Sequence, residues 1–167
     1  MKTFEPSCAI AYSANLFGDK WSLLILRDFI LHKKNRLKEL ISSKEKISTN
    51  ILTNRLKSLL NEDLIRILDP KGTKKSRQYF VTEKGLLALP IIIEFYLFSV
   101  HYIEESKLNE SQMMIKKELL QDRILFEEQR IKSYLHFVNK LHSKQAAKKN
   151  IDYYFFETIK NTSANSC

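Results

Sequence analysis

The hydrophobic pattern of this 167-residue chain changes its period at Leu64. Before that residue, apolar side chains recur every three to four positions, which is typical of amphipathic helices. After it, the segments LIRIL and RQYFVT are rich in β-branched and aromatic residues and alternate as short strands do. The sequence therefore predicts several short helices followed by one small pair of strands.

Capping residues and helix breakers place the boundaries of these helices. Asp19 and Ser48 stand immediately before apolar-periodic runs, where their side chains can accept hydrogen bonds from the first amides of a helix. Ser7 and Thr82 are expected to cap helices in the same way, and Gly18 is expected to end the first one. The predicted helices cover residues 7–17, 20–31, 37–43, 49–60 and 83–102.

The two strand segments are joined by DPKGTKKS, in which Pro70 and Gly72 are turn residues. This arrangement predicts a hairpin with a basic tip. Packed helices followed by a two-stranded hairpin describe a winged helix-turn-helix. The predicted fold class is thus mainly α, with a small β-hairpin wing.

A polar break at 104–110 precedes a second region, for which we predict a long helix over 111–144. Its apolar residues follow a 4-3-4-3 spacing that is typical of a short coiled-coil seam; they are Leu120, Ile124, Ile131, Tyr134, Val138 and Leu141. The alternative is that this helix packs back on its own domain. Residues 151–159, IDYYFFETI, are expected to cover the seam. We therefore divide the chain into a winged helix-turn-helix domain, 1–103, and a helical extension, 104–167, that serves dimerisation.

The outer face of the predicted helix 49–60 is unusual. It carries Asn50, Asn54 and Lys57, flanked by Thr49 and Thr53, where a surface helix more often carries Glu and Lys. Asn can pair with adenine through two hydrogen bonds, and Thr can contact a thymine methyl group or a phosphate. The face suits double-stranded DNA, although a solvated polar face is the simpler alternative.

The charge distribution agrees with a nucleic-acid partner. The chain has a formal net charge of +9, and residues 1–103 hold 17 lysines and arginines against 10 acidic residues. The predicted hairpin tip is the most basic stretch, with four basic residues and no acidic one between them: Lys71, Lys74, Lys75 and Arg77. A basic surface of this kind favours an acidic partner such as DNA.

Other classes of function find little support. The four histidines have no metal-ligand spacing, and three glycines do not form a phosphate-binding loop, so we predict no enzyme, no metal and no cofactor. The most apolar stretch, 86–100, contains Pro90 and Glu94 and is too short to span a membrane. No signal peptide is recognised, and two cysteines at opposite ends of the chain do not form a disulfide framework. We expect a cytoplasmic protein that makes no membrane contact.

Four ordered motifs carry a resemblance to a known family. They are FGDKWSLLILRD, RLKEL, ISTNILTNRLKSL and YFVTEKG. Together they resemble the HxlR-type winged-helix transcriptional regulators, which are related to the MarR-like regulators. The matching residues are Gly18, Lys20, Trp21, Arg36, Glu39, Leu40, Ile47, Ser48, Leu52, Arg55, Leu56, Tyr79, Thr82 and Gly85. The resemblance covers residues 7–103.

The resemblance implies a homodimeric transcriptional regulator that reads a pseudo-palindromic DNA site. The first helix and the C-terminal helices would form the dimer, and the helix at 49–60 would enter the major groove. Cys8, expected in the first turn of a helix, is a candidate redox sensor, and a small-molecule effector is an alternative input. The predicted DNA-contacting residues are Arg36, Lys38, Ser48, Thr49, Asn50, Thr53, Asn54, Arg55, Lys57, Lys71, Lys74, Lys75 and Arg77.

One rival interpretation remains open at the level of sequence. A basic helical domain with a coiled-coil tail would also serve as an adaptor, a protein-interaction module without sequence-specific DNA binding. The basic hairpin tip favours the DNA interpretation, because an adaptor has no need for KGTKKSR between two strands.

Overall fold

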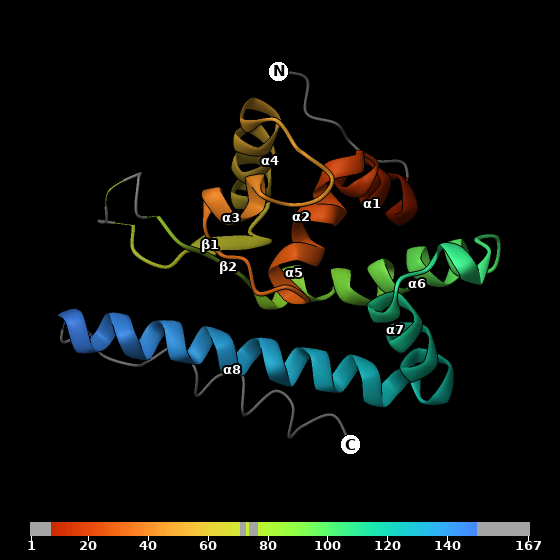
Figure 1. Ribbon diagram of the computed structural model, residues 1–167. Helices are drawn as coiled ribbons and strands as arrows, with labels where there is room; N and C mark the ends of the chain where they lie inside the picture. The colour runs from red at the N-terminus through yellow and green to blue at the C-terminus, as the bar shows by residue number, and fades with distance from the viewer. Residues whose placement is uncertain (1–7, 71–72, 74–76, 150–167) are drawn as a thin grey trace.

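The computed structural model describes residues 8–70, 73 and 77–149 (Figure 1). Its helices are α1 (Ala9–Phe17), α2 (Lys20–Ile30), α3 (Leu37–Ile41), α4 (Thr49–Asn61), α5 (Glu83–Leu86), α6 (Ala88–Val100), α7 (Glu110–Gln121) and α8 (Arg123–Lys149). Two strands, β1 (Ile65–Ile67) and β2 (Tyr79–Val81), follow α4, and a 3-10 turn, Glu105–Lys107, precedes α7. The predicted fold class, mainly helical with a small hairpin wing, is confirmed.

The predicted caps fix the starts of three helices. Asp19 Oδ1 accepts hydrogen bonds from the amides of Trp21 at 2.8 Å and Ser22 at 3.1 Å at the start of α2. Ser48 caps α4 and Thr82 caps α5, as expected. The first helix differs, because Cys8 is its N-cap and α1 begins at Ala9. Ser7 lies outside the described residues.

The hairpin is antiparallel, with Ile65 opposite Val81 and Ile67 opposite Tyr79. α5 packs against one end of the hairpin, where Gly85 makes a close contact with the backbone of Leu64. A Cβ atom on Gly85 would lie 2.1 Å from the carbonyl oxygen of Leu64 and 2.6 Å from a Val81 methyl carbon. Only glycine therefore allows α5 to pack against the end of both strands.

A single hydrophobic core joins the helices and the hairpin. Its centre is α2, whose Leu26 and Phe29 are fully buried and which contacts α1, α4, α6, α8 and β2. Leu52 of α4, Ile65 of β1 and Leu89 of α6 are equally buried in the same cluster. The helix that was expected to meet DNA is thus anchored by one face in the core of the domain.

The predicted helix over 83–102 is wrong in one respect, because it consists of two helices. α5 ends at Leu86, and α6 runs from Ala88 to Val100. Pro90 has no amide hydrogen to donate to the carbonyl group of Leu86, so the helix cannot continue across this point. Proline is tolerated in the first turn of α6, where amide groups have no partner within the helix.

The predicted helix over 111–144 is also interrupted. α7 ends at Gln121, Asp122 takes an extended conformation with φ −157° and ψ 98°, and α8 begins at Arg123. The carboxylate of Asp122 accepts a hydrogen bond from the amide of Leu125 at 2.9 Å, so it caps the new helix. An aspartate inside an apolar-periodic pattern therefore marks a helix start here.

The break divides the predicted coiled-coil seam, and the prediction of one continuous seam is wrong. Leu120 and Ile124 are 67% and 73% exposed, whereas Tyr134 and Val138 are buried in the core of their own domain. The alternative, a helix that packs back on its own chain, holds for this part of α8. Residues 151–159, expected to cover the seam, lie outside the described residues. The division at residue 103 stays a prediction.

Tyr134 joins α8 to the hairpin by a buried hydrogen bond. The amide of Val81 donates a hydrogen bond to the Tyr134 hydroxyl oxygen at 2.7 Å, and the phenol ring is 1% exposed. Burial raises the pKa of Tyr134 far above its usual value, so the hydroxyl stays protonated. α8 lies on the far side of the hairpin from α4 (Figure 1) and covers the outer edge of β2.

Candidate nucleic-acid interface

The residues of α4 divide cleanly between an inner and an outer face. Leu52, Leu56 and Leu59 are at most 2% exposed and contact the core. The predicted DNA-contacting residues on the other side are all exposed: Ser48, Thr49, Asn50, Thr53, Asn54 and Lys57. No acidic residue occurs in α4. The outer face therefore presents amides, hydroxyls and one ammonium group, with nothing on the helix itself to repel phosphate.

Arg55 points elsewhere. Its Nε atom lies 3.3 Å from Asp19 Oδ1, the same carboxylate that caps α2, and the residue is half-buried. This ion pair ties the middle of α4 to the start of α2. The structure thus gives Arg55 a partner within the chain, while its predicted contact with DNA stays a prediction.

A buried carboxylate fixes the turn that leads into α4. Asp28 is 3% exposed, and Lys34 Nζ lies 2.9 Å and Arg27 Nη2 2.7 Å from its two oxygens. Ser43, in the turn between α3 and α4, donates its hydroxyl to the same carboxylate and accepts a hydrogen bond from Lys34 Nζ at 2.6 Å. Arg27 also pairs with Glu45 at 2.8 Å. Three successive parts of the helix-turn-helix are therefore joined through one charge.

The pKa values of this cluster follow from its geometry. Burial by itself raises the pKa of Asp28, but hydrogen bonds from Ser43, Lys34 and Arg27 outweigh it and hold that pKa below its usual value. The hydrogen bond from Arg27 lowers the pKa of Glu45. Both carboxylates are thus charged at neutral pH, and the charged form of Asp28 belongs to the folded state.

The start of α3 lies beside the base of the wing. Arg36 is the N-cap residue of α3, and its backbone forms an isolated antiparallel β-bridge with Gln78, just before β2. The amide of Tyr79 donates to the carbonyl oxygen of Asn35 at 2.9 Å. Arg36 and Lys38 are exposed, so two of the predicted basic contacts stand next to the wing.

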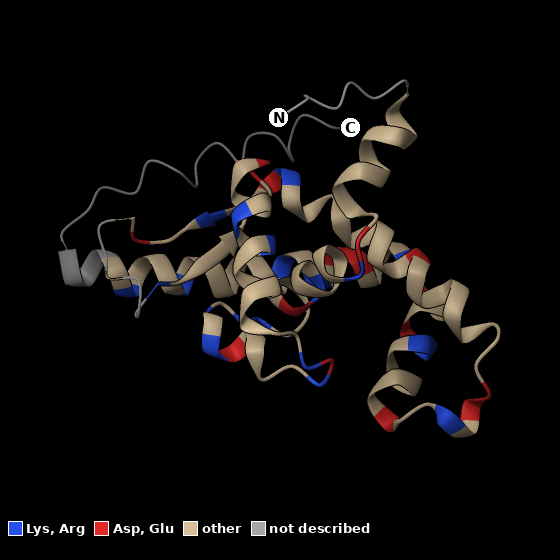
Figure 2. Cartoon of the chain, turned by 90° about the horizontal axis from the view of Figure 1, so that it is seen from above, with Lys and Arg blue, Asp and Glu red and all other residues tan. Residues whose placement is uncertain are grey.

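The wing itself is described only in part. Lys71, Lys74 and Lys75 lie outside the described residues, so their predicted contacts stay predictions. Arg77 is half-buried, and its Nε atom is buried without a hydrogen-bond partner among the described residues. Figure 2 shows that lysines and arginines occur around the hairpin on several different elements.

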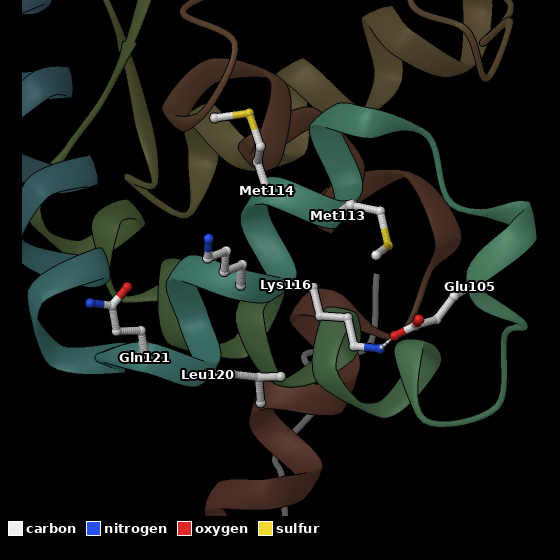
Figure 3. A pocket seen from close by; sticks show the side chains of 7 residues that line it. Glu105, Met113, Met114, Lys116, Leu120 and Gln121 are labelled. Atoms are coloured by element: carbon white, nitrogen blue, oxygen red, sulfur yellow. Dashed lines mark hydrogen bonds and ion pairs between the residues drawn. The ribbon is translucent and has the colours of Figure 1, made fainter.

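Two further features lie away from this face. Cys8 is exposed and its Sγ atom accepts a hydrogen bond from the Ala11 amide at 3.4 Å, so the thiol is an N-cap rather than a first-turn residue. A cavity of about 580 Å³ lies on α7, where Met113, Met114 and Leu120 supply apolar surface and Lys116 pairs with Glu105 at the edge (Figure 3).

The described part of the chain gives no support to two other kinds of site. None of the described helices combines the length and the apolar character that crossing a bilayer requires. No three His, Cys, Asp or Glu side chains within the described ranges are gathered as metal ligands would be.

The family comparison agrees with this geometry. The model of the HxlR-like helix-turn-helix matches residues 16–107, more than half of the chain. The chain belongs to the HxlR-like helix-turn-helix family. This family consists of DNA-binding transcriptional regulators and not of enzymes. All of α7 and all of α8 lie beyond the part of the chain that the HxlR-like model covers.

Individual relatives of this HxlR-like chain are moderately similar. An uncharacterized HTH-type transcriptional regulator, sll1512 of Synechocystis sp., is 26% identical over 103 residues, which cover 59% of this chain and 72% of the relative. The solved structure of PA1607, a candidate transcription factor, superposes with a TM-score of 0.54 at 25% identity and covers 62% of this chain and 71% of that one. The solved structure of a candidate MarR-family regulator from Porphyromonas gingivalis W83 superposes with a TM-score of 0.50 at 28% identity. The match covers 62% of this chain and 100% of that one.

The Asp28 cluster and the Tyr134 contact were not predicted from the sequence. Asp28 stands between Arg27 and Phe29 in an otherwise apolar run, and a carboxylate at a core-facing position of α2 was a sign that it must be paired. Its partners Lys34 and Ser43 lie in loops, where periodicity gives no information. Tyr134 was recognised as apolar, but not as a hydrogen-bond acceptor.

Replacing Asp28 with Asn should lower the free energy of unfolding by about 3 kcal/mol at pH 7, because it leaves Lys34 and Arg27 without their buried partner. The folded-state pKa of Asp28 is below its unfolded-state value, so its contribution is present above about pH 4 and is lost as the pH falls through the folded-state pKa. Urea unfolding between pH 2 and pH 7 should show a steeper acid loss for the wild type than for Asp28→Asn.

The matched control is Asp63→Asn, which removes an exposed carboxylate paired with Arg66. It should change stability little, because exposed ion pairs contribute little. Equal stability and equal pH profiles for wild type and Asp28→Asn would contradict the role given to this carboxylate.

Proposed function

We propose that this chain is a cytoplasmic homodimeric transcriptional regulator that binds a pseudo-palindromic site in double-stranded DNA. The observation that carries the proposal is the outer face of α4, where exposed Asn50 and Asn54 stand one helical turn apart and no acid occurs. In winged helix-turn-helix proteins this helix enters the major groove. Membership of the HxlR-like family supports the same function.

The groups on this surface suit two kinds of contact. The amides of Asn50 and Asn54 each offer a donor and an acceptor, which is what bidentate pairing with adenine needs. Lys57, Arg36 and Lys38 are exposed cations that suit phosphate oxygens, which position the protein without reading sequence. Base reading is thus assigned to the amides and positioning to the cations.

A second copy of the chain is the proposed partner of α1 and α6. None of the nine residues of α1 is buried, although the helix has the apolar sequence AIAYSANLF. Ile10 is 80% exposed, and Phe95 and Phe98 of α6 are 63% and 68% exposed. Both helices lie at the end of the molecule away from the wing (Figure 1). Large apolar side chains in this number favour association with another surface.

Two features of the chain suit the reception of a signal by the regulator. Cys8 is exposed at the start of α1, next to the proposed dimer face, and this position suits a redox sensor. The cavity on α7 has a volume in the range of small-molecule sites, which suits an apolar effector.

The Asn54→Ala variant should lose specific binding by about 1–3 kcal/mol, the usual contribution of a bidentate base contact. Its binding to random duplex should stay unchanged, because no charge is lost. Lys57→Ala should weaken specific and random binding together, because a phosphate contact does not depend on sequence. Selection from a random duplex library would supply the specific site, and fluorescence anisotropy would measure both affinities.

The control for these variants is Gln121→Ala, an exposed amide at the end of α7. It should bind like the wild type. A library selection that enriches no sequence would contradict the proposal and favour the adaptor. Wild-type affinity of Asn54→Ala for the selected site would show that the amide face is only a solvated surface.

The dimer has its own test. Replacing Phe95 and Phe98 with Asp should raise the dimer dissociation constant more than a hundredfold, because about 3 kcal/mol of apolar burial is lost. Sedimentation equilibrium would measure it, with circular dichroism as the check on folding. Ile51→Asp, at a 39% exposed position of α4 outside the proposed dimer face, should leave self-association unchanged. A double variant that remains a tight dimer would place the interface elsewhere.

A further inference from the structure

The C-terminal part of α8 is basic throughout. Residues 129–149 contain six lysines and arginines and no Asp or Glu, whereas residues 123–128 contain two glutamates and one arginine. In Figure 2 this end of the helix carries blue segments and no red one. The positive charge of this part of α8 is therefore not balanced by acidic residues of the same helix. Most solvated surface helices, in contrast, carry charges of both signs.

This part of α8 lies directly beside the wing. The His142 ring packs edge-on against Phe80 of β2, with 5.2 Å between ring centroids. One side of α8 also reaches the loop between α2 and α3, where Lys33 Nζ donates to Ser133 Oγ at 2.6 Å. The helix thus runs from the loop that precedes Arg36 to the strand that follows the wing tip.

Lys140 and Lys144 are exposed cations of this region that have no acidic partner among the described residues. Both are exposed, and because they are four residues apart they share one side of the helix. Ser133, which meets the α2–α3 loop, lies on the same side about two turns earlier. Within the described residues no acidic group pairs with either lysine, whereas Lys132 is paired with Glu128 at 3.3 Å.

We propose that Lys140 and Lys144 bind the phosphate backbone of DNA beyond the segment read by α4, on the flank next to the wing. The inference rests on the proposed function, since it needs α4 on DNA. A wing lies along the backbone or an adjacent minor groove. The C-terminal part of α8 packs against β2 and extends to the same end of the molecule as the wing (Figure 1). It would then lie next to the phosphates that flank the wing.

The contact has a defined physical consequence. Phosphate contacts add affinity without sequence preference, and each contact increases the dependence of log K on log salt by about 0.9. α8 lies outside the HxlR-like match, so this surface would be an addition of this chain to the family's DNA-binding unit. It would lengthen the stretch of duplex that one protomer covers.

The test compares the full-length wild type with the Lys140→Ala, Lys144→Ala double variant. Binding to random-sequence duplexes of 20 and 40 base pairs is measured by anisotropy between 50 and 300 mM salt. On the long duplex the variant should lose about 1.8 units of salt slope per protomer and about tenfold or more in affinity at 0.1 M salt. On the short duplex, which lacks flanking phosphates, the difference should be much smaller.

The matched control is Lys107→Ala, Lys117→Ala, which removes the same charge from exposed lysines at the other end of the molecule. It should keep the wild-type slope, and circular dichroism would check that both variants fold. An unchanged slope for the α8 variant, an equal loss in the control, or an equal loss on both duplexes would overturn the flanking contact while the proposed function stands. A wild type that binds neither duplex would overturn both.

Discussion

The carboxylate of Asp28 is the contact on which the placement of α4 depends. It receives hydrogen bonds from α2, from the loop after α2 and from the turn between α3 and α4. A buried charge is tolerated only when it is paired, so each of these segments is held at hydrogen-bonding distance from one point. The inner leucines keep α4 in the core, and the Asp28 cluster fixes where that helix begins. Together they decide which side chains of α4 face outward.

The hairpin needs similar support from outside its own residues. Two strands of three residues form a marginal sheet by themselves. Gly85 allows α5 to pack against their ends, and the Tyr134 hydroxyl accepts a hydrogen bond from the outward-facing amide of Val81. α8 therefore contacts the wing directly, although the HxlR-like match ends at residue 107. Tyr134 and Val138 of α8 are both buried in the same hydrophobic cluster as Leu52 of α4.

Features determined by neighbouring residues could be predicted from the sequence. Asp19, Ser48 and Thr82 cap the helices they precede, because a cap needs only the amides two or three residues away. The strands and the exposed amide face of α4 followed from the period of the apolar residues. Features that depend on distant contacts could not be predicted in this way. A break at Asp122 sets where α8 begins and therefore which of its side chains face the core. The Asp28 cluster joins residues that are 6 and 15 positions apart.

We propose that DNA meets the face formed by α4 and the start of α3. Acetylation of lysines, followed by mass spectrometry with and without a saturating 40-base-pair duplex, tests it most directly. We expect DNA to protect Lys38 and Lys57 strongly, because both are exposed on this face, and to leave Lys107 and Lys117 at the opposite end as reactive as in the free protein. Protection of Lys107 and Lys117 with unchanged reactivity of Lys38 and Lys57 would contradict it.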